Sequence, residues 1–430
     1  MAAQDLVGQR IKAIRRQRGL SQAQLAHPEL SDSYVSLIES GKRTPTPAVL
    51  ELLAQKLDCS LTYLVNGVTA EQMEDLEVGL SFAKIALENG EVEEARRRYA
   101  ELLTDANLQG LASLRVEARY GYALASEACG ELAEAISVHE QLSESEAETM
   151  TQERKIGVAL ALCRCHRERG DYSAAVQVGE QALERLGKSG WNDALIELGS
   201  TLLGVYLRRG DMLRAGHFAA ELLAAADALG TPRAAVAACW NAAYVAEEAG
   251  RGEEALTLIE RALAIQSETG EPRNLARLRQ AHANLVLKLC PNDSERAYDL
   301  LLRAQREMEA AATSTFERAL GALDLAWAEI VLHHPEQAVE YARAVVDLVR
   351  GTPGWMETRA ALLLSQAHFL LHQDEEAAAE LDTVSRWLEN VPPTRKTAED
   401  WMTLAEMRRR IGEDEQSVAA YQRALACVEL

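Results

Sequence analysis

A short stretch near the start of the chain, SDSYVSLIESGKR at residues 31–43, combines hydroxyl side chains, a carboxylate, an apolar side chain and two cations. If Val35 and Ile38 face inward on a helix, the opposite face is left for contact with a partner. That face consists of Asp32, Ser33, Ser36 and Leu37. Its oxygen atoms can form hydrogen bonds, and Lys42 and Arg43 add positive charge beside it. The stretch therefore predicts a recognition surface.

The rest of the chain carries no motif that is typical of an enzyme. It has no P-loop, no G-x-S-x-G, no H-E-x-x-H and no paired carboxylates outside charged solvent faces, and its nine histidines are scattered. The seven cysteines form one local cluster, Cys163-x-Cys165-His166. Three ligands on one helical turn cannot all converge on one metal, so buried reduced thiols are the better interpretation. We expect neither enzymatic activity, nor a metal, nor a cofactor.

Charge is distributed unevenly along the 430 residues, which are too many for one ordinary core. The formal charge is −21, yet the segment 1–70 holds 8 Lys and Arg against 6 Asp and Glu, and the rest holds 37 against 60. Five of the N-terminal cations lie close together at the start of the chain, namely Arg10, Lys12, Arg15, Arg16 and Arg18. This pattern predicts a basic N-terminal patch on an acidic body.

The sequence has no apolar stretch that suggests a membrane. No apolar run reaches the roughly 18 residues that a membrane span needs, and the segment MAAQDLVGQR lacks the apolar core of a signal peptide. A cytoplasmic location without a membrane partner is expected.

Cap signals divide the segment 1–70 into five short helices. The candidate N-caps are Ser21, Ser31 or Asp32, Thr46 and Ser60. Gly19 ends the first helix and Pro28 breaks the second. The side chains expected to face inward are Val7, Ile11, Ile14, Leu25, Val35, Ile38, Leu50, Leu53 and Leu57.

Five such helices, with a tight connection between the second and the third, resemble the Cro and lambda-repressor helix-turn-helix domain, also called the XRE type. The resemblance covers about residues 4–66, and the segments GLSQAQLA, SYVSLIESGKRTP and LELLAQKLDCSLTYL match in order. One departure is the connection HPEL, which is a residue shorter than usual and contains Pro28.

The resemblance implies a role for each residue of the recognition surface. The third helix of such a domain lies in the major groove of DNA, where Leu37 can contact a thymine methyl and Ser33 and Ser36 can bond several base edges. Asp32 can accept from cytosine N4, or it can serve only as the helix cap. The residues implied to contact phosphates are Gln22, Ser31, Lys42, Arg43 and Thr44. The resemblance also implies a structural salt bridge from Arg15 to Glu39.

An internal repeat runs through the remaining chain at even spacing. Its copies begin with GEVEEA at Gly90, GELAEA at Gly130, GDYSAA at Gly170, GDMLRA at Gly210 and GRGEEA at Gly250, and later copies keep Ala297, Ala338 and Ala377 or begin at Gly412. A glycine can end one helix with positive φ, and a small alanine five residues later lets the next helix pack closely. This resembles the tetratricopeptide repeat. We predict an all-α protein with a DNA-binding domain at 1–68 and a solenoid of about nine hairpins at 69–430.

The first helices of the hairpins are expected to line the concave face of the solenoid. Candidate effector-binding residues on this face are Trp240, Asn241, Tyr244 and Asn284, with Glu247 beside them. The asparagines can pair with a peptide backbone, or they can pack between repeats. Arg164, Arg167 and Arg208 fall near the same face, although most charges on solenoids are simply solvated.

A helix-turn-helix domain followed by tetratricopeptide repeats resembles the Gram-positive regulators that sense peptide pheromones and actinobacterial regulators of similar layout. The resemblance implies a homodimeric transcriptional regulator that binds a two-fold site in double-stranded DNA and responds to a peptide or small-molecule effector. The alternative is an adaptor, localised by DNA, whose solenoid recruits a partner protein. A change in DNA affinity with a small ligand, rather than only with another protein, would favour the regulator.

Overall fold

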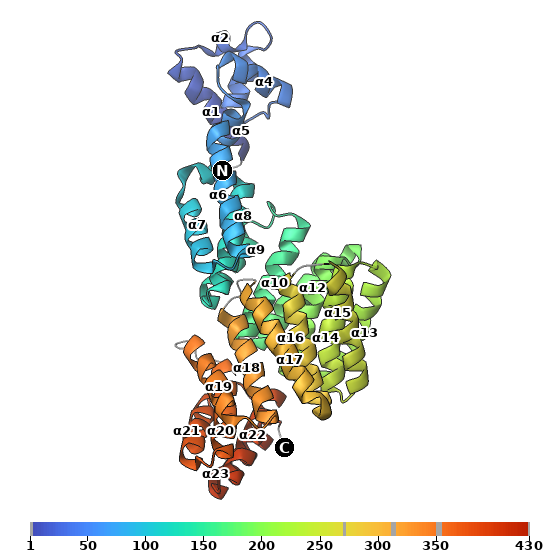
Figure 1. Ribbon diagram of the computed structural model, residues 1–430. Helices are drawn as coiled ribbons and strands as arrows, with labels where there is room; N and C mark the ends of the chain where they lie inside the picture. The colour runs from blue at the N-terminus through green and yellow to red at the C-terminus, as the bar shows by residue number, and fades with distance from the viewer. Residues whose placement is uncertain (1–2, 270–271, 311–314, 350–354, 429–430) are drawn as a thin grey trace. The chain divides into compact units, whose positions relative to one another are not determined.

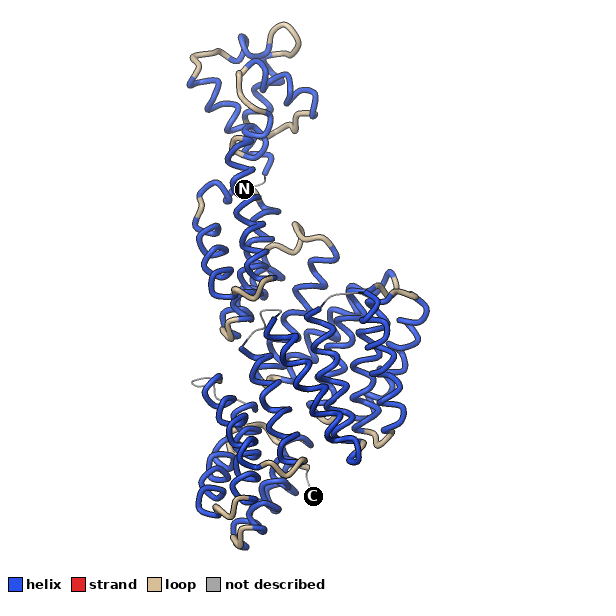
Figure 2. The backbone as a smooth tube through the Cα atoms, in the orientation of Figure 1, coloured by secondary structure: helices blue, strands red, loops and turns tan. Residues whose placement is uncertain are grey.

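The computed structural model describes residues 3–269, 272–310, 315–349 and 355–428 of the chain (Figure 1). Every regular element in these ranges is a helix, and none of the described residues lies in a strand (Figure 2). The prediction of an all-α fold is therefore confirmed.

The first five helices form a small bundle. They are α1 (Ala3–Gln17), α2 (Gln22–Ala26), α3 (Asp32–Glu39), α4 (Pro47–Lys56) and α5 (Leu61–Asn66). Their shared core consists of Ile11, Ile14, Leu25, Ala26, Val35, Ile38, Leu53, Ala54, Leu57 and Leu64, while Val7 and Leu50 pack against it half-buried. Gly8 lets α1 approach α3 closely, because a Cβ atom there would lie 2.1 Å from the carbonyl oxygen of Ile38.

Local cap chemistry explains where these helices start. Ser21 and Gln24 form the reciprocal capping box at α2. Thr46 caps α4 with Pro47 following, and Ser60 caps α5. At α3 the cap is Ser31, whose Oγ accepts from the amide of Tyr34 at 3.3 Å. The alternative that Asp32 serves as the cap is therefore wrong.

Eighteen further helices pair as nine consecutive hairpins in the described part of the chain, as predicted. The pairs are α6 (Ala70–Glu88) with α7 (Val92–Thr104), α8 (Ala112–Ala128) with α9 (Leu132–Ser145), α10 (Gln152–Arg169) with α11 (Tyr172–Leu186), α12 (Asp193–Arg209) with α13 (Met212–Leu229), α14 (Pro232–Glu248) with α15 (Gly252–Thr269), α16 (Pro272–Leu289) with α17 (Ser294–Ala310), α18 (Thr315–Val331) with α19 (Pro335–Leu348), α20 (Trp355–Leu370) with α21 (Asp374–Leu388), and α22 (Arg395–Arg410) with α23 (Asp414–Cys427). Short 3-10 turns occur at Ala106–Gly110, Gly187–Ser189 and Pro291–Asp293.

The repeated glycine and alanine have the structural roles expected of them. Gly170 and Gly210 end α10 and α12 in the left-handed region, with φ of 83° and 86°. The alanines of the repeat are fully buried, namely Ala95, Ala135, Ala175, Ala215, Ala255, Ala297, Ala338 and Ala377. Ser417 takes this place in the last hairpin, and its hydroxyl donates to the carbonyl of Ala405 at 2.8 Å.

Two later hairpins make the same turn without glycine. His333 and His372 adopt left-handed backbone angles, with φ of 63° and 58°. They stand between α18 and α19 and between α20 and α21. A side chain in this region is normally disfavoured, so these two turns depend on the packing of the helices that flank them.

By their internal contacts the residues form two units. One contains residues 1–88 and 93–122, and the other contains residues 89–92 and 123–430. The first unit thus holds the five N-terminal helices, α6, nearly all of α7 and the first part of α8, so the boundary between the units falls within α8. The predicted boundary after residue 68 stays a prediction.

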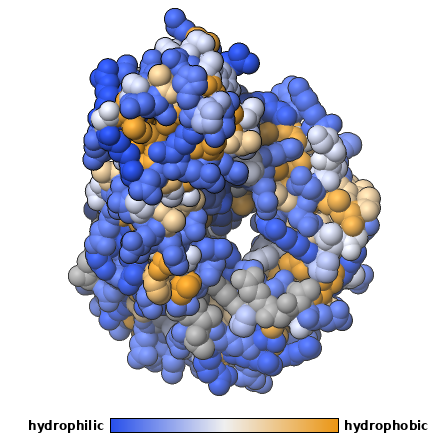
Figure 3. All heavy atoms as spheres, turned by 90° about the horizontal axis from the view of Figure 1, so that it is seen from above, coloured by the Kyte–Doolittle hydropathy of each residue, from blue (hydrophilic) through white to orange (hydrophobic). Residues whose placement is uncertain are grey.

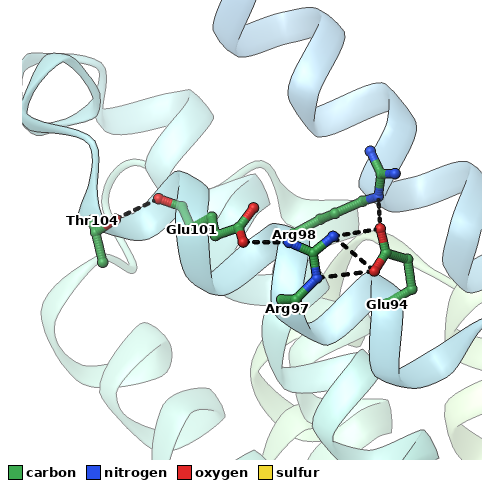
Figure 4. Close-up of polar contacts among 5 residues, drawn as sticks. All are labelled: Glu94, Arg97, Arg98, Glu101 and Thr104. Atoms are coloured by element: carbon green, nitrogen blue, oxygen red, sulfur yellow. Dashed lines mark hydrogen bonds and ion pairs between the residues drawn. The ribbon is translucent and has the colours of Figure 1, made fainter.

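The face drawn in Figure 3 is mainly hydrophilic, with hydrophobic residues in scattered patches. Helix α7 shows how exposed charges are used, since Glu94 accepts from Arg97 and Arg98 within the same helix, and Arg97 also bonds Glu101 (Figure 4). Such exposed pairs contribute little to stability. Among the described helices, none combines the length and apolarity that a membrane crossing needs.

Candidate functional site

The predicted recognition face of α3 is open to solvent. The exposed residues at this face are Ser31, Asp32, Ser33, Ser36 and Leu37. Leu37 keeps 37% of its surface exposed, so part of its side chain is open to contact with a partner. Ser31 and Ser33 lie within hydrogen-bond distance, Oγ to Oγ 3.2 Å, and Asp32 lies 3.4 Å from Nε2 of His27.

A buried ion pair holds α3 in place. The guanidinium of Arg15 on α1 donates to both oxygens of Glu39 at the end of α3, at 2.5 and 2.9 Å, and both residues are more than nine-tenths buried. Gln22 at the start of α2 also donates to Glu39, at 2.8 Å. Burial raises the pKa of Glu39, but the hydrogen bonds from Arg15 and Gln22 outweigh burial and hold that pKa below its ordinary value. Three helices therefore meet at one carboxylate.

The loop after α3 presents the cations beside the recognition face. The amides of Lys42 and Arg43 both donate to the carbonyl of Leu37, at 2.9 and 3.2 Å, which turns the loop tightly. The guanidinium of Arg43 lies 5.1 Å from the ring centre of Tyr34. Lys42, Arg43 and Thr44 are all exposed, and the side chains of Lys42 and Arg43 make no ion pair with a described residue.

Several of the first cations are engaged inside the domain. Arg10 donates to the carbonyls of Leu64 and Val65, at 2.8 and 2.5 Å, and so caps the end of α5. Arg18 donates to the backbone and the carboxylate of Asp58, at 2.8 and 3.1 Å. Three of the five cations of the predicted basic patch, namely Arg10, Arg15 and Arg18, thus have partners within the domain.

The predicted effector residues on α14 are half-buried. Arg277 lies over the ring of Trp240, 5.8 Å from its centre. The amide of Asn241 donates to the carbonyl of Ala237 in its own helix at 3.1 Å, which leaves its oxygen available. Burial raises the pKa of Tyr244 to about 12, so its hydroxyl stays protonated at neutral pH.

Asn284 lies on α16 and bridges to the next hairpin. Its amide donates to Asp324 on α18 at 2.7 Å, and Gln280, one turn earlier on α16, donates to the other oxygen at 2.5 Å. Burial raises the pKa of Asp324 to about 7 despite these two donors. Sequence reasoning missed Gln280 and Asp324, although the spacing from Gln280 to Asn284 marks one helical face.

The first helices also meet across the solenoid. Helix α12 packs against α22, and the guanidinium of Arg208 on α12 lies 4.7 Å from the ring centre of Trp355 on α20. A Cβ atom at Gly210 would lie 2.7 Å from Cβ of Arg395. These contacts join the fourth hairpin to the eighth and ninth, and no local motif predicts them.

Gly210→Ala should therefore cost more stability than Gly250→Ala, which is its matched control. Both glycines have positive φ, at 86° and 75°, so both variants incur backbone strain of about 1–2 kcal/mol. A Cβ atom at Gly250 meets nothing within 4 Å, whereas at Gly210 it meets Arg395, which adds about 1–3 kcal/mol. Urea unfolding followed by tryptophan fluorescence measures both. Equal costs would mean that α12 and α22 do not pack closely in solution.

The cysteine cluster has the character of a structural core. Cys163 and Cys165 are free and buried, and burial raises the pKa of Cys163 to about 11 and that of Cys165 further. Among the described residues, no three side chains of the metal-ligating types stand together. Thiols held protonated in this way are poor nucleophiles and poor metal ligands.

Comparison with known proteins identifies the N-terminal part. Residues 11–64 match the family model described as helix-turn-helix. The N-terminal domain is a helix-turn-helix domain of the XRE type. The chain is 42% identical to the immunity repressor protein of Bacillus phage phi105 over 72 residues, which are 16% of this chain and 50% of the repressor. The match thus spans half the length of that curated relative.

The helical repeats resemble solved structures of low sequence identity. A Rap protein complexed with competence and sporulation factor superposes with a TM-score of 0.53 and 14% identity, covering 83% of this chain and 98% of that one. The Rap conjugation gene regulator of plasmid pLS20, in complex with the Phr* peptide, gives 0.51 and 12%, covering 82% and 95%. At these identities the likeness establishes the fold, an array of helical repeats of the tetratricopeptide type.

Proposed function

We propose that this protein is a transcriptional regulator that binds double-stranded DNA through α3 and binds an effector through its solenoid. The observation that carries the proposal is the exposed face of α3, which the buried pair of Arg15 and Glu39 holds within a helix-turn-helix domain. A rigid helix with small polar side chains and one exposed leucine suits the major groove of DNA.

Within this proposal the residues divide into two kinds. Ser33, Ser36 and Leu37 meet base edges, while Lys42 and Arg43 meet phosphates. Asp32 accepts from a cytosine amino group. Ser31 and Thr44 add hydroxyls to phosphates, and Gln22, whose amide already bonds Glu39, has only its carbonyl oxygen and remaining N–H for contact with the DNA backbone.

The recognition face carries no Arg, Asn or Gln, so a single DNA-binding domain (a head of the proposed dimer) lacks the strongest bidentate base contacts. Two heads on a two-fold site would supply the missing affinity, which is why a homodimer is part of the proposal. Sequence-dependent DNA shape would add to the specificity.

The proposed effector is a peptide or a small molecule held by Trp240, Asn241, Tyr244 and Asn284. The fold supports a peptide, because a Rap regulator of the same fold was solved with the Phr* peptide. Effector binding would favour one of two states of the dimer and so change the freedom of the DNA-binding heads. An effector with equal affinity for both states would change nothing.

Variants of α3 and of the following loop test the DNA-binding part. Using DNA selected by the full-length protein from a random library, Arg43→Ala should weaken binding to all sequences and lower the salt slope by about one unit. Leu37→Ala should instead change the preference at one thymine position, by roughly 1 kcal/mol or more.

Leu61→Ala is the matched control for Leu37→Ala, because Leu61 on α5 has 36% of its surface exposed against 37% for Leu37. The control should leave both affinity and sequence preference unchanged. Identical behaviour of all three variants on selected and scrambled DNA would contradict the proposal that α3 lies in the major groove.

A further inference from the structure

Two arginines on the first helices of the solenoid have weaker carboxylate partners than neighbouring arginines. No described carboxylate lies within ion-pair distance of Arg208, whose pKa is lowered by burial and by the nearby Arg167, while Tyr172, Asp400 and Tyr244 act to raise it. Arg167 has only Glu168, the next residue in the chain, at 3.6 Å, and donates no hydrogen bond to a described residue. By contrast, Arg233 binds both oxygens of Glu197, at 2.5 and 2.7 Å.

A glycine brings three consecutive hairpins together beside these arginines. Gly204 lies on α12, one turn before Arg208. A Cβ atom at Gly204 would lie 3.7 Å from Nη1 of Arg167 on α10 and 3.7 Å from Oδ1 of Asn241 on α14. The side chains of Arg167 and Asn241 therefore approach each other over Gly204, which has no side chain of its own. This leaves room beside a guanidinium and a carboxamide.

The C-terminal hairpins also contact α12 beside Arg208. Trp355 on α20 lies under the guanidinium of Arg208 at 4.7 Å, and α22 packs against α12. Stacking on an aromatic ring fixes the plane of a guanidinium while leaving its N–H groups free at the edge. Such an edge matches the two oxygens of a carboxylate.

We propose that Arg167 and Arg208 form a carboxylate-binding subsite of the effector face, with the oxygen of Asn241 beside them to accept from an N–H of the ligand, so that the effector is a peptide that carries a carboxylate here. This proposal rests on the proposed function and names the ligand class. Charge complementarity supports it, because Arg208 has no carboxylate within ion-pair distance and Arg167 has only its chain neighbour Glu168 at 3.6 Å, so both guanidinium groups can take a further carboxylate. The carboxylate is either the C-terminus of the peptide or an acidic side chain.

Three libraries of short random acetylated peptides distinguish these sources. The first has a free C-terminus and no Asp or Glu, the second has an amidated C-terminus with Asp and Glu, and the third has an amidated C-terminus and neither acid. The full-length protein is mixed with each library, and retained peptides are identified by mass spectrometry after size exclusion. Retention from the first or second library, but not from the third, is the expected result.

Affinities of the enriched peptides are then measured with variants. Arg208→Gln and Arg167→Gln should each weaken binding at least about tenfold, and Arg208→Lys should fall between, because lysine keeps the charge but not the planar fork. The matched control is Arg214→Gln, since Arg214 also lies over a ring, that of Tyr206 at 5.5 Å, but pairs with Glu180 at 2.6 Å. Tryptophan fluorescence checks that each variant is folded. If Arg208→Gln does not fold, the affinity of Arg167→Gln tests the carboxylate subsite.

The outcomes separate the two proposals. Equal retention from all three libraries, with affinities that Arg208→Gln and Arg167→Gln leave unchanged, would overturn the carboxylate subsite while keeping a peptide effector. Retention of no peptide from any library would reject the peptide effector and the subsite with it.

Discussion

Replacing Glu39 with alanine should destabilise the N-terminal domain by about 3–5 kcal/mol, because it leaves the guanidinium of Arg15 buried without its partner. Arg15 and Glu39 keep only 8% and 5% of their surfaces exposed, so water cannot replace the lost carboxylate. Specific DNA binding should be lost together with protection of α1, α2 and α3. Hydrogen exchange of the full-length protein, read by mass spectrometry over residues 3–40, measures the loss locally.

Glu51→Ala is the control for this variant, since Glu51 is exposed and pairs with no described residue. It should change exchange little. The double variant Arg15→Met/Glu39→Leu should recover part of the stability, because apolar side chains of similar size remove the unpaired charge. Exchange in Glu39→Ala no faster than in Glu51→Ala would show that the ion pair does not hold α3.

Low pH should weaken the ion pair of Arg15 and Glu39 by protonating Glu39. The pKa of Glu39 lies below its ordinary value in the folded protein, so the pair stabilises the domain above the unfolded pKa of about 4 and this stabilisation is lost as pH falls through the folded value. Once exchange rates are corrected for the intrinsic rate at each pH, the protection of α1, α2 and α3 in the wild type should therefore fall in this acidic range. The Glu39→Ala variant should lack that part of the pH dependence.

The small N-terminal domain could be predicted closely from the sequence because its signals are local. Ser21, Thr46 and Ser60 cap helices through amides only a few positions away, so neighbouring residue types determine the outcome. The inward positions Val35 and Ile38 follow from helical spacing alone. The engagement of Arg10 with the carbonyl of Leu64 could not be predicted in this way, since the two residues lie far apart in the chain.

In the solenoid, too, the features that depend on local sequence could be predicted and those that depend on packing could not. The buried alanines recur at the same place near the start of the second helix of each hairpin, and the even spacing of the repeat therefore predicted the nine hairpins of the described chain. The turns at His333 and His372 lack the expected glycine, because flanking packing can hold a left-handed residue that local preference disfavours.

Contacts between distant hairpins could not be predicted from the repeat. The packing of α12 against α22 depends on the rotation between successive hairpins summed over several of them, and a small change per repeat moves the ends far apart. Trp355 therefore had no signal in the sequence that tied it to Arg208. Asp324 was missed as the partner of Asn284 for another reason, since the two residues lie on consecutive hairpins, 40 positions apart, and no local motif pairs them.

Asp324→Asn should stabilise the solenoid at pH 8 by roughly 3–4 kcal/mol and have little effect at pH 4. Burial raises the pKa of Asp324 to about 7, even though Gln280, Arg359 and Asn284 favour the charged form. A carboxyl group with a raised folded pKa contributes stability below its unfolded pKa of about 4, and this contribution is lost as pH rises through the folded value. Asparagine carries no charge at either pH. Urea unfolding by tryptophan fluorescence is suitable, because all six tryptophans lie beyond residue 190.

The control for Asp324→Asn must be an exposed aspartate. Asp227→Asn serves, because Asp227 has 56% of its side chain exposed and pairs with Arg261 at the surface. Such a surface pair contributes little to stability, so this variant should run parallel to the wild type between pH 4 and pH 8. If Asp324→Asn also ran parallel, Asp324 would be solvated in the folded protein and its bonds to Gln280 and Asn284 would not form in a buried layer. A profile that separates between pH 4 and pH 8 would instead place α16 against α18 as described, with the amide N–H of Asn284 engaged between hairpins and its carbonyl oxygen left for an effector.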